Sequence, residues 1–230
     1  MSERTTPAPV ATYGLLGLLA TRSWTGYELT RQYRRSLRFV WPTSEAHLYR
    51  EQRRLVELGW ATVEQEPAGR RTRKRYTITP SGRVALRRWL ATEPGEPLFQ
   101  VEGILRTFHG DQAGSTELAA AMRSTADHAG RMLTEMLGFV DEYLAEGGPL
   151  DMLETGRRGD FRGRPMFPER LHVVAAAIDV TTRLLHELED FFTETADEVA
   201  AWPGPHDRRL TARTRARLEA IRDRGRHRSW

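Results

Sequence analysis

The sequence predicts a mainly α-helical protein built in two parts, with a single β-hairpin in the first part. In most of the chain the apolar residues recur at three- and four-residue steps, which is the pattern of amphipathic helices. One stretch, residues 60–79, instead alternates between two faces, which is the pattern of paired strands. Charge separates the parts as well, because residues 1–92 carry 17 basic and 7 acidic side chains whereas residues 93–205 carry 9 and 21. This asymmetry is typical of a nucleic-acid-binding module joined to a body that binds no phosphate.

The composition of the 230 residues excludes several kinds of site. There is no cysteine, which rules out disulfides, thiolate zinc sites, iron–sulfur clusters and a cysteine nucleophile. The longest nearly apolar run, residues 10–20, is too short to cross a bilayer, and it does not have the form of a signal peptide. We therefore expect a soluble, cytoplasmic protein without a membrane partner.

The first part begins with two short predicted helices. Apolar residues cover most of the surface of residues 10–20, as expected of a helix that is buried on several sides. A second helix follows from Thr25, which can form a capping box with Glu28, and it should fade near Ser36. The inner face of this second helix is expected to carry Tyr27, Leu29 and Tyr33.

A third helix is predicted from Thr43 or Ser44 to Leu58, with Gly59 as its C-terminal stop. A helical wheel gives this helix an inner side and an outer side. The inner side, which is expected to pack on the first helix, carries Ser44, Leu48, Gln52, Leu55 and Leu58. The outer side carries Ala46, Tyr49, Arg50, Arg53 and Glu57, with His47 and Arg54 at its edge.

A hairpin and a fourth helix follow. The first strand is predicted at residues 60–65, residues 67–69 form the turn, and the second strand returns over residues 73–79. The fourth helix starts at Pro80 and ends before a linker at residues 92–97. Three helices, a two-stranded β wing and a further helix form the order of a winged helix-turn-helix domain.

The second part is expected to be α-helical throughout, without a strand. Helices are predicted at roughly 98–109, 115–146 and 168–200, and a long loop at 147–168 separates the last two. Long amphipathic helices need partners for their apolar faces, which an antiparallel neighbour or a second subunit can provide. This part is therefore predicted to be an α-helical C-terminal dimerisation domain.

The expected domains are residues 10–92, for DNA binding, and residues 98–200, for dimerisation and effector binding. A basic tail at 201–230 is expected to be partly disordered, with a helix from about Leu210 to Arg222. The basic, glycine-rich segment at 156–168 is interpreted either as a disordered loop, which we favour, or as a segment that touches phosphate.

The outer side of the third helix is a candidate for reading duplex DNA. A helix fits the major groove, where arginine reads guanine edges and hydroxyl groups hold phosphates. Taken alone, the pattern equally fits an ordinary solvated face. The hairpin favours DNA, because five cations lie within six positions at its tip: Arg70, Arg71, Arg73, Lys74 and Arg75. Near a phosphate backbone such a run releases counterions and gives a salt-sensitive affinity.

Several motifs, in order along the chain, resemble those of the PadR family of transcriptional regulators. They are YGLLGLLA at 13–20, GYEL at 26–29, Ser44 with Leu48-Tyr49, RRLVELGW at 53–60 and RKRYTITPSGR at 73–83. The last motif is similar to the family's wing strand and its turn into the next helix. A weaker resemblance to the helical C-terminal domain of longer PadR-like proteins covers roughly residues 95–200.

The resemblance implies a winged-helix DNA-binding domain, a homodimer held by C-terminal helices, and repression that a small molecule relieves. Carried over by position, the candidate DNA contacts are Ser44, Tyr49, Arg73 and Lys74. The helical wheel adds Arg50 and Arg53 independently. His47 either contacts a base or caps local backbone. Gln52 and the Ala46-His47 pair depart from the family pattern, so we do not transfer the family's base preference.

We hypothesise that a dimer binds an inverted-repeat operator in double-stranded DNA. Its two recognition helices would lie in successive major grooves, and its wings would contact flanking phosphates. A small-molecule effector would change the separation of the two helices. Trp89, Phe99 and Phe108 are candidates for an effector pocket. The alternative for these three residues is simple interface packing.

Other functions have weaker support. No pair among the seven histidines has the i, i+4 spacing of helix-borne metal ligands, and phosphate loops and a serine elbow are absent. We therefore expect no enzyme, no metal site and no cofactor. The remaining alternative is an architectural or RNA-binding winged-helix protein without an effector. Against RNA, only Tyr76 lies close to the basic wing as a stacking aromatic.

Overall fold

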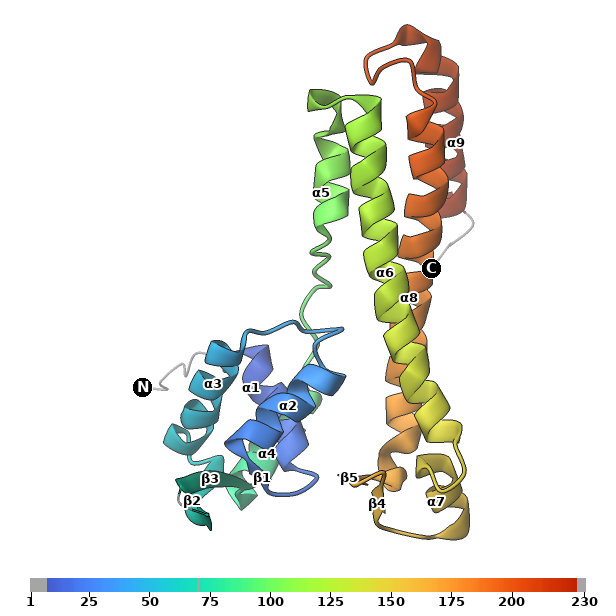
Figure 1. Ribbon diagram of the computed structural model, residues 1–230. Coiled ribbons are helices and arrows are strands. Elements are labelled where there is room, and N and C mark those ends of the chain that lie inside the picture. The colour runs from blue at the N-terminus through green and yellow to red at the C-terminus, as the bar shows by residue number, and fades with distance from the viewer. Residues whose placement is uncertain (1–7, 70, 227–230) are drawn as a thin grey trace. The chain divides into compact units, whose positions relative to one another are not determined.

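The computed structural model describes residues 8–69 and 71–226 of the chain. They form two compact units, the first ending at Pro97 and the second beginning at Leu98 (Figure 1). The mainly α-helical fold with a small antiparallel sheet confirms the predicted fold class. Among the described residues, no helix is both long and apolar enough to cross a membrane.

The first unit contains a bundle of short helices and a small sheet. Its helices are α1 (Val10–Leu19), α2 (Gly26–Ser36), α3 (Glu45–Glu57) and α4 (Pro80–Leu90). Its strands are β1 (Trp24–Thr25), β2 (Ala61–Ala68) and β3 (Arg71–Ile78), which lie antiparallel in the order β1-β3-β2. The hairpin β2–β3 is the predicted wing, and α2 and α3 form the helix-turn-helix.

The ends of these helices follow the predicted caps. Thr25 caps α2, and Glu28 completes the capping box by accepting the backbone N–H of Thr25. Of the two candidates for the α3 cap, Ser44 is the one used, since its side chain accepts from the N–H of His47. Gly59 then adopts the left-handed conformation, with φ of +68°, that lets the chain leave α3 for β2.

The core of the first unit lies where α1, α2 and α3 meet. Its fully buried large apolar side chains are Leu15, Leu16, Leu19, Leu29, Tyr33, Leu48 and Leu55. Burying one such leucine stabilises the fold by roughly 1.5–3 kcal/mol. The prediction for Tyr27 was wrong, because its side chain is 66% exposed; it lies two residues before Leu29 and therefore on the opposite face of α2. Leu58 is also exposed, since α3 ends one residue before it.

The sheet differs from the prediction in two ways. A third strand, β1, pairs with β3, but its two residues are too short to give a periodic signal. The hairpin is longer than predicted, because Pro67 lies inside β2 opposite Thr72 and is not part of the turn. A proline is tolerated here because β2 is an edge strand, where a missing N–H need not break the ladder.

The second unit is built on two long helices. α6 (Ser115–Leu144) and α8 (Leu171–Ala200) run antiparallel along each other, and α5 (Glu102–Phe108) packs beside the start of α6 (Figure 1). The start of α6 packs against the end of α8 through an apolar cluster. Its buried members are Leu118, Ala119, Met122, Ala126, Phe192, Ala196 and Val199.

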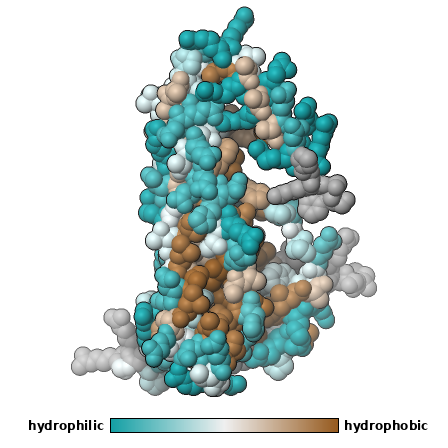
Figure 2. Space-filling model, turned by 90° about the vertical axis from the view of Figure 1, so that its right-hand side faces the viewer, coloured by the Kyte–Doolittle hydropathy of each residue, from teal (hydrophilic) through white to brown (hydrophobic). Residues whose placement is uncertain are grey.

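A row of apolar side chains remains exposed on α8 beside this buried seam. The row consists of Val173, Val180, Leu184 and Phe191, which follow each other at steps of seven, four and seven residues. Figure 2 views the side of the molecule that carries α8 and shows apolar residues gathered there. A stripe of this spacing is the form in which a helix presents itself to another helix.

The expected loop at 147–168 contains regular structure. It holds α7 (Pro149–Thr155) and a short hairpin of β4 (Asp160–Phe161) and β5 (Arg164–Pro165). The favoured interpretation of 156–168 as a disordered loop was wrong, because Phe161 is buried and Arg164 binds Glu142 of α6 at 2.8 Å. A strand of two residues is too short to show periodicity, so these two strands could not be predicted from the sequence.

The basic tail contains the helix that was expected from about Leu210 to Arg222. This helix is α9 (Thr211–Arg226), which extends four residues beyond the expected end. Two arginines of α9, Arg213 and Arg217, pair with Glu198 near the end of α8. The remaining residues, 227–230, lie outside the described part of the chain.

The backbone at Gly82 lies so close to the backbone at Trp60 that only glycine fits at this position. A Cβ at this position would overlap the carbonyl oxygen of Trp60 and touch Ile78. Gly82→Ala should therefore lower the free energy of unfolding of the first unit by about 1–3 kcal/mol. Gly17→Ala is the matched control: its Cβ meets nothing within 4 Å, so it should be neutral or stabilising by about 0.5–1 kcal/mol. Urea unfolding followed by tryptophan fluorescence tests this, and equal midpoints for the two variants would contradict it.

Candidate nucleic-acid interface

Helix α3 is held by one side, and this leaves the other side free. Leu48 and Leu55 are fully buried against the core of the first unit. Gln52 is buried too, and its amide donates to the carbonyl of Gly26 at 3.0 Å and to the hydroxyl of Thr30 at 2.8 Å. These contacts with α2 explain how a polar residue is accommodated on the inner side of α3, where it departs from the family pattern.

The structure also buries Glu51, which the helical wheel left unassigned. Its side chain is only 2% exposed, and it accepts a hydrogen bond of 2.5 Å from the hydroxyl of Thr12 on α1. Arg54 and His47 lie on its other sides, with contacts of 3.3 Å and 3.6 Å. An ionised carboxylate at this depth needs such partners.

The predicted outer side of α3 is exposed. Ser44, Tyr49, Arg50 and Arg53 all lie at the surface, and His47 is half-buried at the edge. Since the inner contacts fix the orientation of α3, these side chains point away from the core. They present hydroxyl and guanidinium groups, which are the groups that bind phosphates and guanine edges.

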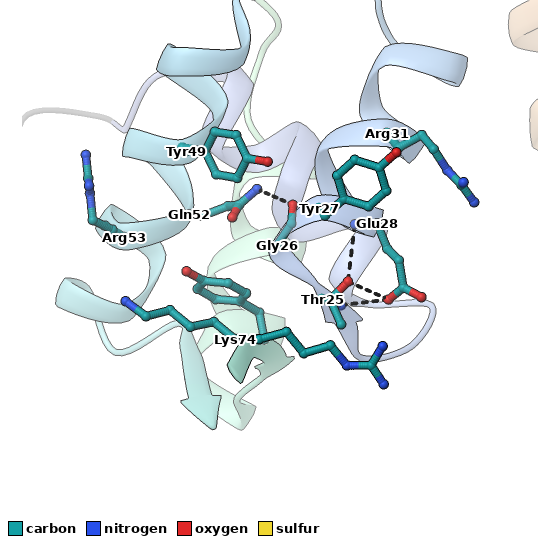
Figure 3. Close-up of a pocket in the computed structure, with 11 residues that line it drawn as sticks. Thr25, Gly26, Tyr27, Glu28, Arg31, Tyr49, Gln52, Arg53 and Lys74 are labelled. Carbon is teal, nitrogen blue, oxygen red and sulfur yellow. Dashed lines mark hydrogen bonds between the residues drawn. The ribbon is translucent and has the colours of Figure 1, made fainter. Parts of the chain in front are cut away.

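A cleft of about 630 Å³ separates α3 from the wing and is closed by the start of α2 (Figure 3). It is lined by Thr25, Gly26, Tyr27, Glu28, Arg31, Tyr49, Gln52, Arg53, Arg73, Lys74 and Tyr76. The structure thus brings together Tyr49 and Arg53 from the predicted helix face with Arg73 and Lys74 from the wing. It adds Tyr27 and Arg31, which the sequence interpretation missed because Tyr27 was assigned to the core.

The wing divides its cations between two faces. Lys74 shares a face with the buried Tyr76 and reaches into the cleft, and its ammonium group has no hydrogen-bond or ion-pair partner in the described part of the chain. Burial raises the pKa of Tyr76, so its hydroxyl stays protonated as a hydrogen-bond donor. Arg70 lies outside the described residues, and of Arg71 only the backbone in β3 is described.

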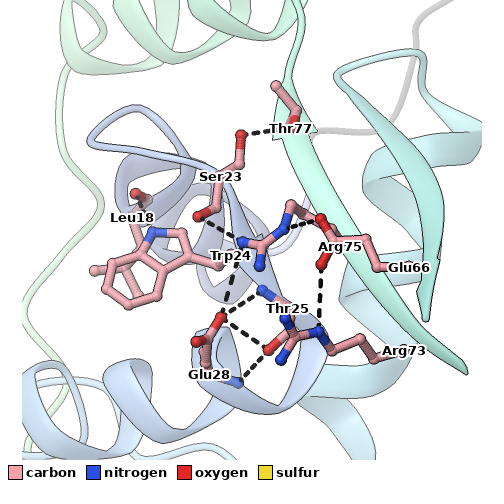
Figure 4. A network of polar contacts seen from close by, with 9 residues as sticks. All are labelled: Leu18, Ser23, Trp24, Thr25, Glu28, Glu66, Arg73, Arg75 and Thr77. Atoms are coloured by element: carbon pink, nitrogen blue, oxygen red, sulfur yellow. Dashed lines mark hydrogen bonds and ion pairs between the residues drawn. The ribbon is translucent and has the colours of Figure 1, made fainter. Parts of the chain in front are cut away.

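Arg73, which also lines the cleft, and Arg75 bind the same carboxylate (Figure 4). Arg73 lies directly opposite Glu66 in the register and bonds it at 3.2 Å, and Arg75 also bonds Glu66. Arg75 further approaches Glu28 of α2 at 4.0 Å and the carbonyl oxygen of Ser23 at 3.4 Å. Arg75 therefore ties the wing to α2, and its guanidinium is directed at protein groups.

These contacts change the acidity of both carboxylates. The hydrogen bond from Arg75, assisted by Arg73, lowers the pKa of Glu66. Partial burial alone would raise the pKa of Glu28, but hydrogen bonds from Thr25 and the charges of Arg22 and Arg75 outweigh it, so this pKa is lowered as well. Both groups are thus held in the ionised form.

The three candidate effector residues are divided between the units. Trp89 belongs to α4 and stacks on Tyr13 of α1, with ring centroids 4.8 Å apart. Phe99 and Phe108 belong to the second unit, where they are 73% and 81% exposed. The described ranges, 8–69 and 71–226, contain no cluster of three or more acidic or histidine side chains able to hold a metal ion.

Comparison with known proteins agrees with this geometry. Residues 15–88 match the model of the transcriptional regulator PadR-like family. The chain is 24% identical to the negative transcriptional regulator PadR of Bacillus subtilis over 61% of this chain and 79% of that protein. It is 36% identical to a probable transcriptional regulator of Mycobacterium tuberculosis over 37% of this chain and 45% of that protein.

Solved structures share the fold. B. subtilis PadR in complex with operator DNA superposes with a TM-score of 0.63 at 18% identity, over 83% of this chain and 99% of that one. A Streptococcus mutans protein gives 0.64 at 17% identity, over 80% and 96%. B. subtilis PadR in complex with p-coumaric acid gives 0.60 at 18% identity, over 83% and 99%.

The Glu66 contacts predict a pH-dependent stability. Because the pKa of Glu66 is lowered by folding, its contribution is complete above the ordinary glutamate value of 4.5 and is lost as the pH falls through the lowered pKa. Glu66→Gln should lower the unfolding temperature by a few degrees near pH 7. It should also flatten the loss of stability as the pH falls below the ordinary glutamate value of 4.5. Glu57→Gln on α3 serves as control. Identical pH profiles for Glu66→Gln and the unmodified protein would contradict this role.

Proposed function

Since residues 15–88 make this chain a member of the transcriptional regulator PadR-like family, we propose that it is a homodimeric repressor that binds an inverted-repeat operator and is released by a small molecule. The family is one of transcriptional regulators, so the chain is not an enzyme. One observation carries the DNA-binding part: the exposed side of α3 and Lys74 of the wing border the same cleft. Duplex DNA can occupy this surface with a base edge and a phosphate at once.

In the proposed complex α3 lies in the major groove and each side chain has a role that follows from its chemistry. Arg50 and Arg53 read guanine edges, because a guanidinium donates two parallel hydrogen bonds. Tyr49, and Ser44 with its free hydroxyl proton, donate to phosphates. Lys74 binds a phosphate as a point charge, and Arg73, which lines the same cleft, binds a phosphate through its guanidinium group. Arg75 is left out, because its guanidinium is occupied by Glu66 and Glu28.

The homodimer is supported by the apolar row on α8. Val173, Val180, Leu184 and Phe191 form a stripe that no other described helix covers. A second copy of the chain offers the same stripe, so two copies can bury it in a symmetric interface. In this proposal residues 98–200 are the dimerisation domain and residues 10–92 are the DNA-binding domain.

Repression and release by an effector have two supports. The B. subtilis relative is named a negative regulator, and a solved structure of that PadR contains p-coumaric acid. For this chain we keep Trp89, Phe99 and Phe108 as candidate effector contacts, since two of them are large exposed aromatics that a ligand or a second subunit can cover.

Footprinting with the full-length protein on the DNA upstream of its own gene tests the proposal. A protected inverted repeat is expected, and protection should survive an excess of single-stranded RNA. No protection, or displacement by RNA, would favour an architectural or RNA-binding protein. Transcription from the footprinted promoter, with and without the protein, then reports the sign of regulation.

The phosphate role of Lys74 predicts a salt effect. Lys74→Ala should weaken binding to all duplex sequences alike and reduce the slope of log K against log salt by about 1. Arg131→Ala on α6 removes one exposed cation elsewhere and should leave the slope unchanged. Fluorescence anisotropy at several salt concentrations measures both. An unchanged slope in the Lys74 variant would remove this residue from the interface.

The apolar row predicts an oligomeric state. The protein should sediment as a dimer at micromolar concentration, and the double substitution Val180→Glu, Leu184→Glu should yield a monomer with unchanged helix content. His186→Glu, on a different face of α8, should remain a dimer. A monomeric unmodified protein, or a dimeric double variant, would overturn the interface.

A further inference from the structure

We propose that His47, oriented by the buried carboxylate of Glu51, is a positioning residue that holds Arg50 ready to read a base. The observation is a short chain of contacts along α3: Nη2 of Arg50 lies 2.7 Å from Nδ1 of His47, and Nε2 of His47 lies 3.6 Å from Oε1 of Glu51. This inference rests on the proposed function of α3 as the recognition helix. It assigns His47 a role other than the two open ones, a base contact or a backbone cap.

The contact with Arg50 determines which nitrogen of His47 carries the proton. A guanidinium has only donors, so Nδ1 must be the acceptor in this hydrogen bond. Nδ1 is therefore unprotonated, and the proton of the neutral ring sits on Nε2. That proton faces Oε1 of Glu51, which is too far for a hydrogen bond but close enough to favour it electrostatically. The two contacts thus select the same tautomer.

Glu51 can orient His47 because it is itself held in place. Its side chain is 2% exposed and accepts the hydroxyl of Thr12, so it cannot turn towards solvent. Arg54, one turn further along α3, neutralises it from the other side at 3.3 Å. A fixed charge inside the unit therefore determines how a half-buried ring at its edge is oriented.

Apart from His47 and Arg50, the described residues that line the hollow beside this ring carry no charge. His47 and Arg50 border a hollow of about 490 Å³, which the start of α1 and the segment before α3 complete. The other lining residues are Pro9, Val10, Ala11, Trp41, Pro42, Thr43 and Ser44, and none of them is ionisable. Arg50 thus has one acceptor on its own helix, and its guanidinium is held there before DNA arrives.

Arg53 provides an internal comparison. It lies on the same exposed side of α3, but within the described residues it has no hydrogen-bond or ion-pair partner. An arginine that is already ordered loses less side-chain freedom on binding than a free one. The base read by Arg50 should therefore depend on His47, whereas the base read by Arg53 should not.

The test selects bound sequences from a random duplex library with the full-length protein and its variants. Arg50→Ala identifies the position that Arg50 reads, with a loss of preference on the order of 5- to 100-fold. His47→Ala should lose a large part of this preference at the same position, and the double variant should lose no more than Arg50→Ala. The position read by Arg53, found with Arg53→Ala, should keep its preference in His47→Ala.

A conservative replacement of His47 distinguishes its role in positioning Arg50 from the mere size of its side chain. His47→Asn places an acceptor oxygen near the former Nδ1 and should recover the preference, whereas His47→Leu should not. Additive losses in the His47 and Arg50 variants, or equal preferences in His47→Asn and His47→Leu, would overturn the proposal. If the unmodified protein selects no sequence at all, the proposed function fails. If Arg50→Ala changes the selection and His47→Ala does not, only the positioning role fails.

Glu51→Gln removes the buried charge with little change in shape. It should reduce the preference at the Arg50 position as His47→Ala does, without changing the salt slope of binding to non-operator DNA. Thermal unfolding is measured in parallel, because replacing the buried Glu51 can also lower the stability of the first unit. A folded Glu51→Gln protein with unchanged preference would remove Glu51 from the arrangement.

Discussion

The interface depends on one constraint: α3 must be buried on one side firmly enough to keep its other side in a defined orientation. Leu48 and Leu55 supply the apolar contact, while Gln52 and Glu51 add hydrogen bonds to α2 and α1. Burial is non-directional, so leucines alone allow small rotations about the helix axis. Two buried polar groups with specific partners do not, because a rotation would leave them unsatisfied.

The wing uses its charges for two purposes because side chains of a strand alternate between faces. The guanidinium of Arg75 pairs with both Glu66 and Glu28, and the pair with Glu28 ties β3 to the start of α2. Lys74, one position away, points to the opposite face and stays available in the cleft. A run of like charges that would otherwise repel is thereby divided into cations that pair with carboxylates and a lysine that faces the cleft.

In the second unit, too, part of each long helix is buried and part is left exposed. α6 and α8 bury one face of each helix in their mutual seam, and the row from Val173 to Phe191 remains beside it. Residues 93–205 carry 21 acidic and 9 basic side chains, so this part of the chain repels phosphate. This charge distribution supports the proposal that nucleic acid binds the first unit and that the apolar row contacts a second copy of the chain.

The sequence by itself determined the helices, because their signals are local. The capping box of Thr25 and Glu28, the cap at Ser44 and the stop at Gly59 each act over a few residues. The exposed side of α3 follows from helical periodicity alone. Only the tertiary structure decided which charged groups are free, since their partners are distant in sequence: Thr12 lies 39 residues before Glu51, and Ser23 lies 52 before Arg75. Periodicity says which residues share a face, but burial and pairing depend on what packs against that face.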